Sequence, residues 1–234
     1  MSAPVRLDLL VFGPHPDDIE IGLGGTIARH VASGHRVGLC DLTRGELGSN
    51  GTVAERAAEG EAARAVLGAA FRDCLAWPDG NIGGADHVRA AASYIRRHRP
   101  RAVAMPHWHD RHPDHLAASE TLTRALFNSG LRKFDADGEA FRPDWVCYYF
   151  INDTSPASFV VDVSAYYEIK GQALACYRSQ FTPAARGAVE TRLTSPRFAQ
   201  LIESRDAQFG ALAGVAFAEG VVVREPVMRD GLLK

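Results

Sequence analysis

The chain has 234 residues, of which 46% are hydrophobic and 23% are charged, and its formal net charge is −2. This size and composition fit one soluble α/β domain, and the small net charge excludes a general basic field for holding nucleic acid. No apolar run is long enough to span a bilayer and the first residues lack a signal-peptide pattern, so we expect a cytoplasmic protein without a membrane partner.

The first half of the chain alternates between short apolar runs and segments of helical composition. The apolar runs, most of which end at glycine, proline or polar residues, predict buried strands at residues 7–12, 36–42, 73–77 and 102–105. The segments between them predict helices at residues 20–33, 53–67, 85–98 and 114–127. This alternation predicts a Rossmann-like, doubly wound α/β fold with a mostly parallel sheet.

From about residue 145 the pattern is less regular. It predicts strands at residues 145–151, 159–163 and 221–224, and helices at residues 166–177 and 196–212. No internal repeat, low-complexity tract or linker interrupts the chain. We therefore expect residues 1–234 to form a single domain with an irregular C-terminal part.

Two clusters of histidine and acidic residues each follow a predicted strand. The first occupies residues 13–20, after the first strand, and the second occupies residues 107–115, after the fourth. Ligand sites of open α/β sheets lie at the carboxyl ends of the strands. We therefore expect both clusters to face one crevice, although they are far apart in the sequence.

The residue types of these clusters suit a metal ion. Imidazole and carboxylate groups bind zinc or ferrous iron, and a catalytic zinc site takes three protein ligands and leaves one position open. His15 and Asp18 are three positions apart at a strand-to-helix turn and can point to one side. One histidine of the second cluster, His112 or His115, completes the set.

The neighbouring groups fit the needs of hydrolysis. Asp17 adjoins a ligand and can take a proton from water whose pKa the metal lowers towards about 7. Asp114 can hold His112 in one tautomer and favour its charged form. A charged imidazole could then stabilise an oxyanion or protonate a leaving amine.

Two other functions remain open at this point. Ferrous oxygenases use the same set of two histidines and one carboxylate, and a non-catalytic module that binds a sugar or a metal is the second alternative. Asp17 and the wound α/β pattern favour hydrolysis over oxygenation. The glycines of residues 22–25 fail the spacing of a dinucleotide fingerprint and indicate close helix packing instead.

The His-Pro-Asp-Asp segment at residues 15–18 and the His-Pro-Asp-His segment at residues 112–115 resemble the paired motifs of the PIG-L or LmbE-like deacetylases. The resemblance extends from residue 7 to about residue 226. It implies a three-layer LmbE-like sandwich and zinc-dependent removal of acetyl from N-acetylglucosamine conjugates. Further segments are similar to the bacillithiol-pathway members, which act on N-acetylglucosaminyl malate: residues 42–48, 110–115, 130–133, 148–152 and 177–181.

The resemblance also implies roles for individual residues. The metal ligands that it implies are His15, Asp18 and His115. It implies Asp17 as the general base. It implies His112, oriented by Asp114, as the acid and oxyanion-stabilising group.

The substrate and the assembly follow from the same resemblance. Arg56 and Arg142 match family arginines at the substrate site, where a guanidinium would pair well with a malate carboxylate, and Glu46 is a further substrate-binding match. The expected metal is Zn²⁺, with Fe²⁺ as the alternative in the cell, and the expected assembly is a homo-oligomer, either trimer or hexamer. One departure is residues 217–221, which read Phe-Ala-Glu-Gly-Val where the family tends to read Tyr-Ala-Glu-Gly-Phe.

Overall fold

The computed structural model describes residues 6–182 and 189–228. Its strands are β1 (Leu9–Gly13), β2 (Val37–Thr43), β3 (Phe71–Trp77), β4 (Ala102–Pro106), β5 (Trp145–Tyr149), β6 (Phe159–Asp162) and β7 (Ala218–Val222). Its helices are α1 (Asp18–Ala32), α2 (Val53–Leu67), α3 (Gly84–His98), α4 (Pro113–Ser129), α5 (Tyr167–Ala175), α6 (Arg178–Phe181) and α7 (Pro196–Ala213), with a 3₁₀ turn at Ser164–Tyr166.

The strands join into one seven-stranded sheet in the order β3-β2-β1-β4-β5-β7-β6. Strands β1 to β5 are parallel to one another, whereas β7 runs antiparallel to both β5 and β6. The order reverses between β1 and β4, which are adjacent, so the segments that follow these two strands meet at the switch point of the sheet. The predicted α/β fold with a mostly parallel sheet is confirmed.

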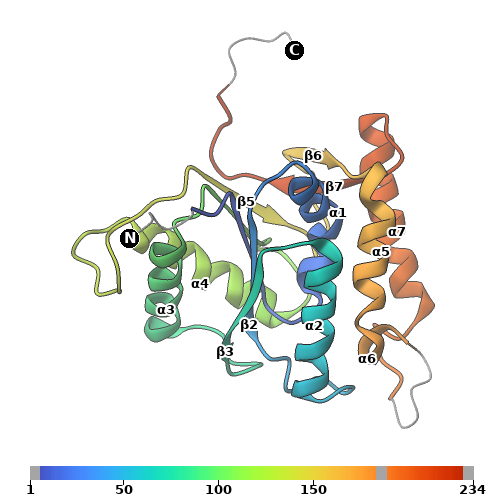
Figure 1. The fold of residues 1–234 in the computed structure, drawn as a ribbon, viewed down its shortest axis with the longest axis horizontal. Helices are drawn as coiled ribbons and strands as arrows, with labels where there is room; N and C mark the ends of the chain where they lie inside the picture. Colours follow the sequence, from blue (N-terminus) through green and yellow to red (C-terminus); the bar gives the residue numbers. More distant parts are fainter. Residues whose placement is uncertain (1–5, 183–188, 229–234) are drawn as a thin grey trace.

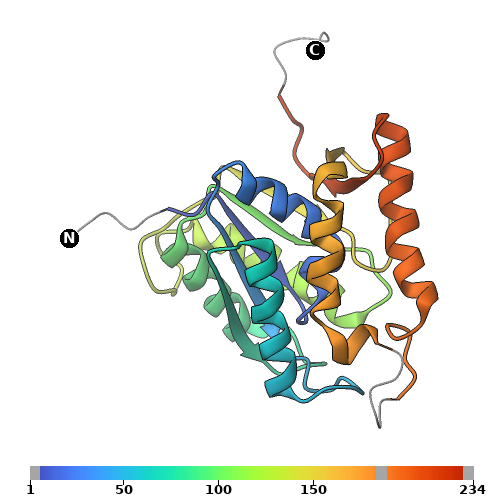
Figure 2. The ribbon, with the colours of Figure 1, turned by 45° about the vertical axis from the view of Figure 1, so that its right-hand side comes forward.

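Helices cover both faces of the sheet and make the three layers (Figures 1 and 2). Alternate residues of β1 point to opposite faces, as the period of a strand requires. Leu10 and Phe12 pack with residues of α3 and α4, whereas Leu9 and Val11 pack with residues of α1, α2, α5 and α7. The strands are therefore apolar on both sides, which explains their continuous apolar runs in the sequence.

Helix α1 is bent where a continuous helix was expected. Leu23 has a non-helical backbone (φ −135°, ψ 17°), and the amides of Gly25 and Thr26 donate to the carboxylate of Glu219, at 3.0 and 2.7 Å. Glycine is needed here for close contact: Gly22 lies against the ring of Tyr149, and a Cβ at Gly25 would approach Val163 to 2.7 Å. The predicted packing role of these glycines is confirmed.

The C-terminal part differs from expectation in its pairing. The last strand begins at Ala218, before the predicted residue 221, and inserts between β5 and β6. The short helix α6 was not expected, because its four residues carry no helical period. Within residues 6–182 and 189–228, no helix has the length and apolar character that a membrane span requires.

Candidate metal centre and active site

The first motif occupies the turn between β1 and α1. His15 precedes the helix, and its backbone amide donates to Asp18 Oδ2 at 3.0 Å. Asp17 stands at the N-cap with φ 115°, a region that residues with a side chain rarely adopt. Backbone strain of this kind costs on the order of 1–3 kcal/mol and clusters at functional sites. The turn thus has a conformation in which His15, Asp17 and Asp18 all line one cavity.

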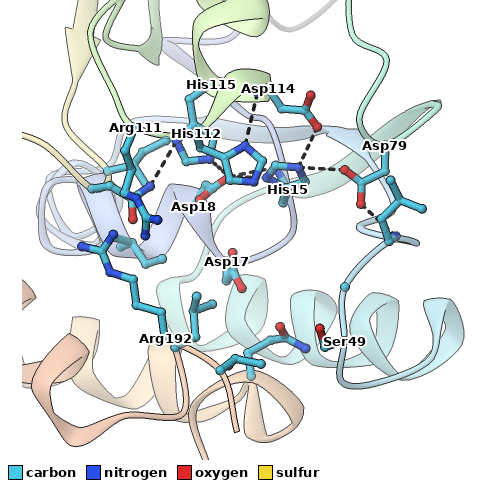
Figure 3. Close-up of a pocket in the computed structure, with 18 of the residues that line it drawn as sticks. His15, Asp17, Asp18, Ser49, Asp79, Arg111, His112, Asp114, His115 and Arg192 are labelled. Atoms are coloured by element: carbon cyan, nitrogen blue, oxygen red, sulfur yellow. Dashed lines mark hydrogen bonds and ion pairs between the residues drawn. The ribbon is translucent and has the colours of Figure 1, made fainter. Parts of the chain in front are cut away.

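The second motif occupies the turn between β4 and α4. His112 is the N-cap of α4 and Pro113 begins the helix, so His115 lies in its first turn. The rings of His112 and His115 stack at 4.7 Å between centroids, and His115 is buried. The two motifs follow β1 and β4, which are neighbours in the sheet. His112 and His115 therefore lie next to His15 and Asp18 (Figure 3).

The three predicted ligands meet at one point. Asp18 Oδ2 lies 3.1 Å from His15 Nδ1 and 3.2 Å from His115 Nε2. One ligand atom from each residue lies within 4.8 Å of the others, and all three residues are buried. Two imidazoles and a carboxylate are the donor set of catalytic zinc and of ferrous sites, so these residues fit either ion.

Opposite charges stabilise this cluster. Burial disfavours the charged form of His115, but the carboxylates of Asp18 and Asp110 outweigh burial and raise the pKa of His115 to about 9. Burial likewise opposes ionisation of Asp18, yet the two histidines hold its pKa well below the usual range. The site therefore keeps an ionised carboxylate in a buried place, which favours a cation there.

Asp17 lies beside the ligands, where its carboxylate is buried. Arg56, which enters from α2, places Nη2 at 3.2 Å from Asp17 Oδ2, and the same guanidinium donates to the backbone oxygens of Pro16 and Gly45. Burial raises the pKa of the Asp17 carboxyl to about 7, although the Arg56 charge opposes this rise. A carboxyl with a pKa near neutrality suits proton transfer.

The Asp114 side chain does not face His112, although the Asp114 backbone amide fixes the tautomer of that ring. The Asp114 carboxylate turns to His15 Nε2 at 3.2 Å and to the Gly80 amide at 2.8 Å, whereas His112 Nδ1 accepts from the Asp114 backbone amide. Burial, aided by the charges of His115 and His15, lowers the pKa of His112, so its charged form is not favoured. Since Nδ1 accepts, the neutral ring carries its proton on Nε2.

Two of the other predicted residues do not line the cavity that the ligands face. Glu46 is exposed and accepts from the amide of Asp79, which ties the loop after β2 to the loop after β3. Arg142 is exposed in a separate groove, with its guanidinium 5.4 Å from the ring centre of Phe127. A substrate contact by either residue stays a prediction.

The cavity over the cluster has a volume of about 580 Å³, and residues that had no predicted role lie in its wall or directly behind it. Asp79 Oδ1 lies 3.0 Å from His15 Nε2, and the buried Asp110 lies 3.1 Å from His115 Nδ1. Arg111 and Arg192 extend towards the open part of the cavity (Figure 3). Asp79 directly follows β3 at the same sheet edge, a signal that was available in the sequence.

Comparison with known proteins places the chain in a family. The family model of the GlcNAc-PI de-N-acetylases (PIG-L) matches residues 10–126, half of the chain. The chain is 40% identical to the conserved protein TT1542 of Thermus thermophilus, whose crystal structure matches with a TM-score of 0.89 over 98% of this chain and 100% of that one.

Curated relatives of the chain are named deacetylases. Diacetylchitobiose deacetylase of Thermococcus kodakarensis is 29% identical over 229 residues, which cover 91% of this chain and 81% of the relative. A 1D-myo-inositol 2-acetamido-2-deoxy-α-D-glucopyranoside deacetylase of Saccharopolyspora erythraea is 31% identical over 64% of this chain and 66% of its own length. With the paired motifs assembled at one sheet edge, these matches show that the chain belongs to the PIG-L family of N-acetylglucosaminide deacetylases.

Proposed function

We propose that this protein is a cytoplasmic, metal-dependent hydrolase that removes the acetyl group from an N-acetylglucosamine conjugate, with N-acetylglucosaminyl malate in bacillithiol biosynthesis as its substrate. The observation that carries the proposal is the joint placement of three buried ligands and a second carboxylate, Asp17, in one cavity. Zinc is the proposed metal and ferrous iron the alternative in the cell. When bound by His15, Asp18 and His115, either ion would supply Lewis-acid chemistry and acidify water.

The residues around the ligands can carry the protons of amide hydrolysis. Asp17 takes a proton from the attacking water, because its carboxylate is at the cavity wall and its pKa is close to neutrality. His112 presents Nε2–H as a donor for the negative charge that develops on the carbonyl oxygen. Protonation of the nitrogen by Asp17 then accompanies cleavage of the carbon–nitrogen bond and releases acetate and a free amine.

Arginines at the open part of the cavity support a substrate with a carboxylate. Arg111 and Arg192 line the cavity and are both exposed, and no ion pair engages either within the described part of the chain. Arg56 also lines the cavity, but its guanidinium is already held by Asp17 and two backbone oxygens. A malate carboxylate would therefore find its partners in the two exposed guanidinium groups.

A substrate panel tests this specificity. Acetate release would be measured from N-acetylglucosaminides that carry malate, a neutral alcohol or a second N-acetylglucosamine in the aglycone position. We expect the malate conjugate to have the highest kcat/KM, and R111A and R192A to lower this value for malate while sparing the neutral conjugate. Equal rates on all conjugates, or highest activity on the disaccharide, would contradict the malate assignment and leave a deacetylase of another N-acetylglucosaminide.

Asp17→Asn tests the assignment of the base. Loss of a general acid or base costs about 10²- to 10⁴-fold in rate. We expect turnover to fall by this factor in D17N while the metal content, measured on the same sample, stays at that of the wild type. Turnover within a few-fold of wild type with the metal still bound would show that another group takes the proton.

A further inference from the structure

Both ligand histidines have carboxylates on either side of the ring: Asp18 on one side, and carboxylates outside the ligand set on the other. His15 turns Nδ1 to Asp18 Oδ2, and His115 turns Nε2 to the same oxygen, so one ring nitrogen of each faces the shared ligand. The opposite nitrogen of each ring faces a carboxylate outside the ligand set. For His15 this is Asp79, at 3.0 Å, together with Asp114, and for His115 it is Asp110, at 3.1 Å.

The Asp110 carboxylate is held firmly in its place. Its side chain is only 3% exposed, and its oxygens accept three hydrogen bonds besides the contact with His115. The backbone amide of His112 and the side-chain amide of Asn152 donate to Oδ1, at 2.9 and 3.0 Å. The backbone amide of Asn152 donates to Oδ2 at 2.9 Å. These donors come from two segments, the β4–α4 turn and the segment that follows β5.

This arrangement determines which nitrogen of His115 is free to bind a metal. An ionised carboxylate only accepts hydrogen bonds, so His115 Nδ1 must donate to Asp110. In the neutral ring that binds a metal, the lone pair is then on the remaining nitrogen, Nε2, which lies on the side of Asp18. If Nδ1 were left without an acceptor, the neutral ring could carry its proton on Nε2 and present no lone pair there.

We infer that Asp110 is a positioning residue of the metal centre, which keeps His115 in the tautomer and orientation that offer Nε2 as a ligand. This inference rests on the metal dependence in the proposed function. Histidine ligands of metals commonly donate their second ring N–H to a carboxylate, and loss of such a partner costs about 10- to 100-fold in metal affinity. Asn152 contributes to this positioning, because its backbone and side-chain amides supply two of the three hydrogen bonds that hold Asp110.

The test is the zinc affinity of the metal-free protein, measured by competition with a chromogenic chelator for wild type, D110N and D206N. Asp206 is a matched control: it is also a buried carboxylate with charged partners, Lys170 and Arg205, but it lies outside the metal cavity. We expect D110N to bind zinc about 10- to 100-fold more weakly, and D206N to bind it within about twofold of wild type while melting at a lower temperature.

A second readout concerns the proton itself. In the zinc-loaded protein, nitrogen-15 NMR of the histidine rings should show a slowly exchanging proton on His115 Nδ1 in wild type and its loss or displacement in D110N. If D110N fails to fold, N152A serves instead, because it removes one donor to Asp110 and keeps the backbone amide. It should bind zinc more weakly than wild type.

The results distinguish the positioning role of Asp110 from the metal dependence of the protein. Unchanged zinc affinity in D110N, or in N152A where that variant replaces it, would overturn the positioning role, as would an equal loss of affinity in D206N. Failure of the wild-type protein to bind zinc or ferrous iron would instead refute the metal dependence in the proposed function.

Discussion

Asp17 combines three features that rarely coincide at one residue: a buried carboxylate, a positive φ and a direct contact with a buried arginine. The positive φ turns the side chain to the cavity while Asp18, the next residue, faces the histidines. Arg56 compensates the charge of Asp17 only in part, because burial still raises the pKa of this carboxyl. The two adjacent carboxylates thus differ in protonation for physical reasons, which suits one for ligation and the other for proton transfer.

The raised pKa of Asp17 predicts how the metal-free protein responds to pH. This carboxyl has a pKa of about 7 in the folded protein, and about 3.9 is usual in unfolded chains. Between these values the folded state holds a proton that the unfolded state has released, so the contribution of Asp17 to stability is lost as pH rises from about 4 to about 7. D17N lacks this titration.

We therefore expect D17N to gain stability relative to wild type as pH rises through this interval. Urea unfolding of both metal-free proteins at several pH values measures the difference. Stability curves that stay parallel from pH 4 to pH 7 would show that Asp17 titrates in its ordinary range.

At the scale of elements, the bend in α1 depends on the last strand. Glu219 of β7 accepts the two α1 amides beyond the bend and also pairs with Lys170 at 2.7 Å. Lys170 is 1% exposed and has a second partner in Asp206. This buried network, far along the chain, therefore holds the second half of α1 in place, beyond the bend at Leu23.

Removal of the Glu219 side chain should therefore lower the stability of the folded protein. Breaking a buried charge pair by deleting one partner costs about 3–5 kcal/mol, because the other charge is left uncompensated. We expect E219A to lower the free energy of unfolding by about this amount in denaturant titrations. The control is E61A, which removes an exposed pair with Arg64 and should change stability by less than about 1 kcal/mol. Equal effects of the two variants would refute the role of the network.

The strand and helix pattern of residues 7–129 was predictable because each element has its own local signal. Helix α2, for example, begins after a capping box at Thr52 and ends at a left-handed Gly68, and both residues can be recognised in the sequence. The bend at Leu23 was not predictable, because it depends on contacts with Glu219, almost 200 positions away. The insertion of β7 between β5 and β6 was not predictable either, because it depends on pairing between separate strands.

For the candidate site, the ligand residues were predictable but the orientation of the side chains around them was not. His15 and Asp18, with one of the two histidines His112 and His115, follow from motif spacing and from the rule that strand ends converge. The family resemblance selects His115, and the structure brings His15, Asp18 and His115 together. Which carboxylate faces which ring nitrogen depends on side-chain orientation after packing. For this reason Asp79 and Asp110 were missed, and Asp114 contacts His112 through its backbone amide while its carboxylate faces His15.

At the scale of the whole molecule, Arg142 indicates how the chain could assemble. The family resemblance places this arginine at the substrate site, yet in the single chain it lies in a separate groove beside Phe127, which is 59% exposed. Arg142 can lie in this groove of its own chain and still contact substrate if the chain forms the expected homo-oligomer, trimer or hexamer. In that case its side chain would reach the cavity of a neighbouring copy.

Mixed oligomers test this arrangement. We expect R142A and D17N each to have little activity alone and to recover part of it when unfolded and refolded together, since some cavities would then receive Asp17 from one copy and Arg142 from another. Light scattering gives the size of the assembly. A monomer in solution, or no recovery in the mixture although each variant refolds, would place Arg142 outside the site.

The most direct test of metal-dependent deacetylation is acetate release under argon from N-acetylglucosaminyl malate, with protein that is metal-free or reloaded with zinc or ferrous iron. We predict that acetate and free amine form in equal amounts only with the reloaded protein, and that the absence of oxygen makes no difference. Turnover that needs oxygen would instead indicate an oxygenase, and tight sugar binding without acetate release under either metal would indicate a binding module.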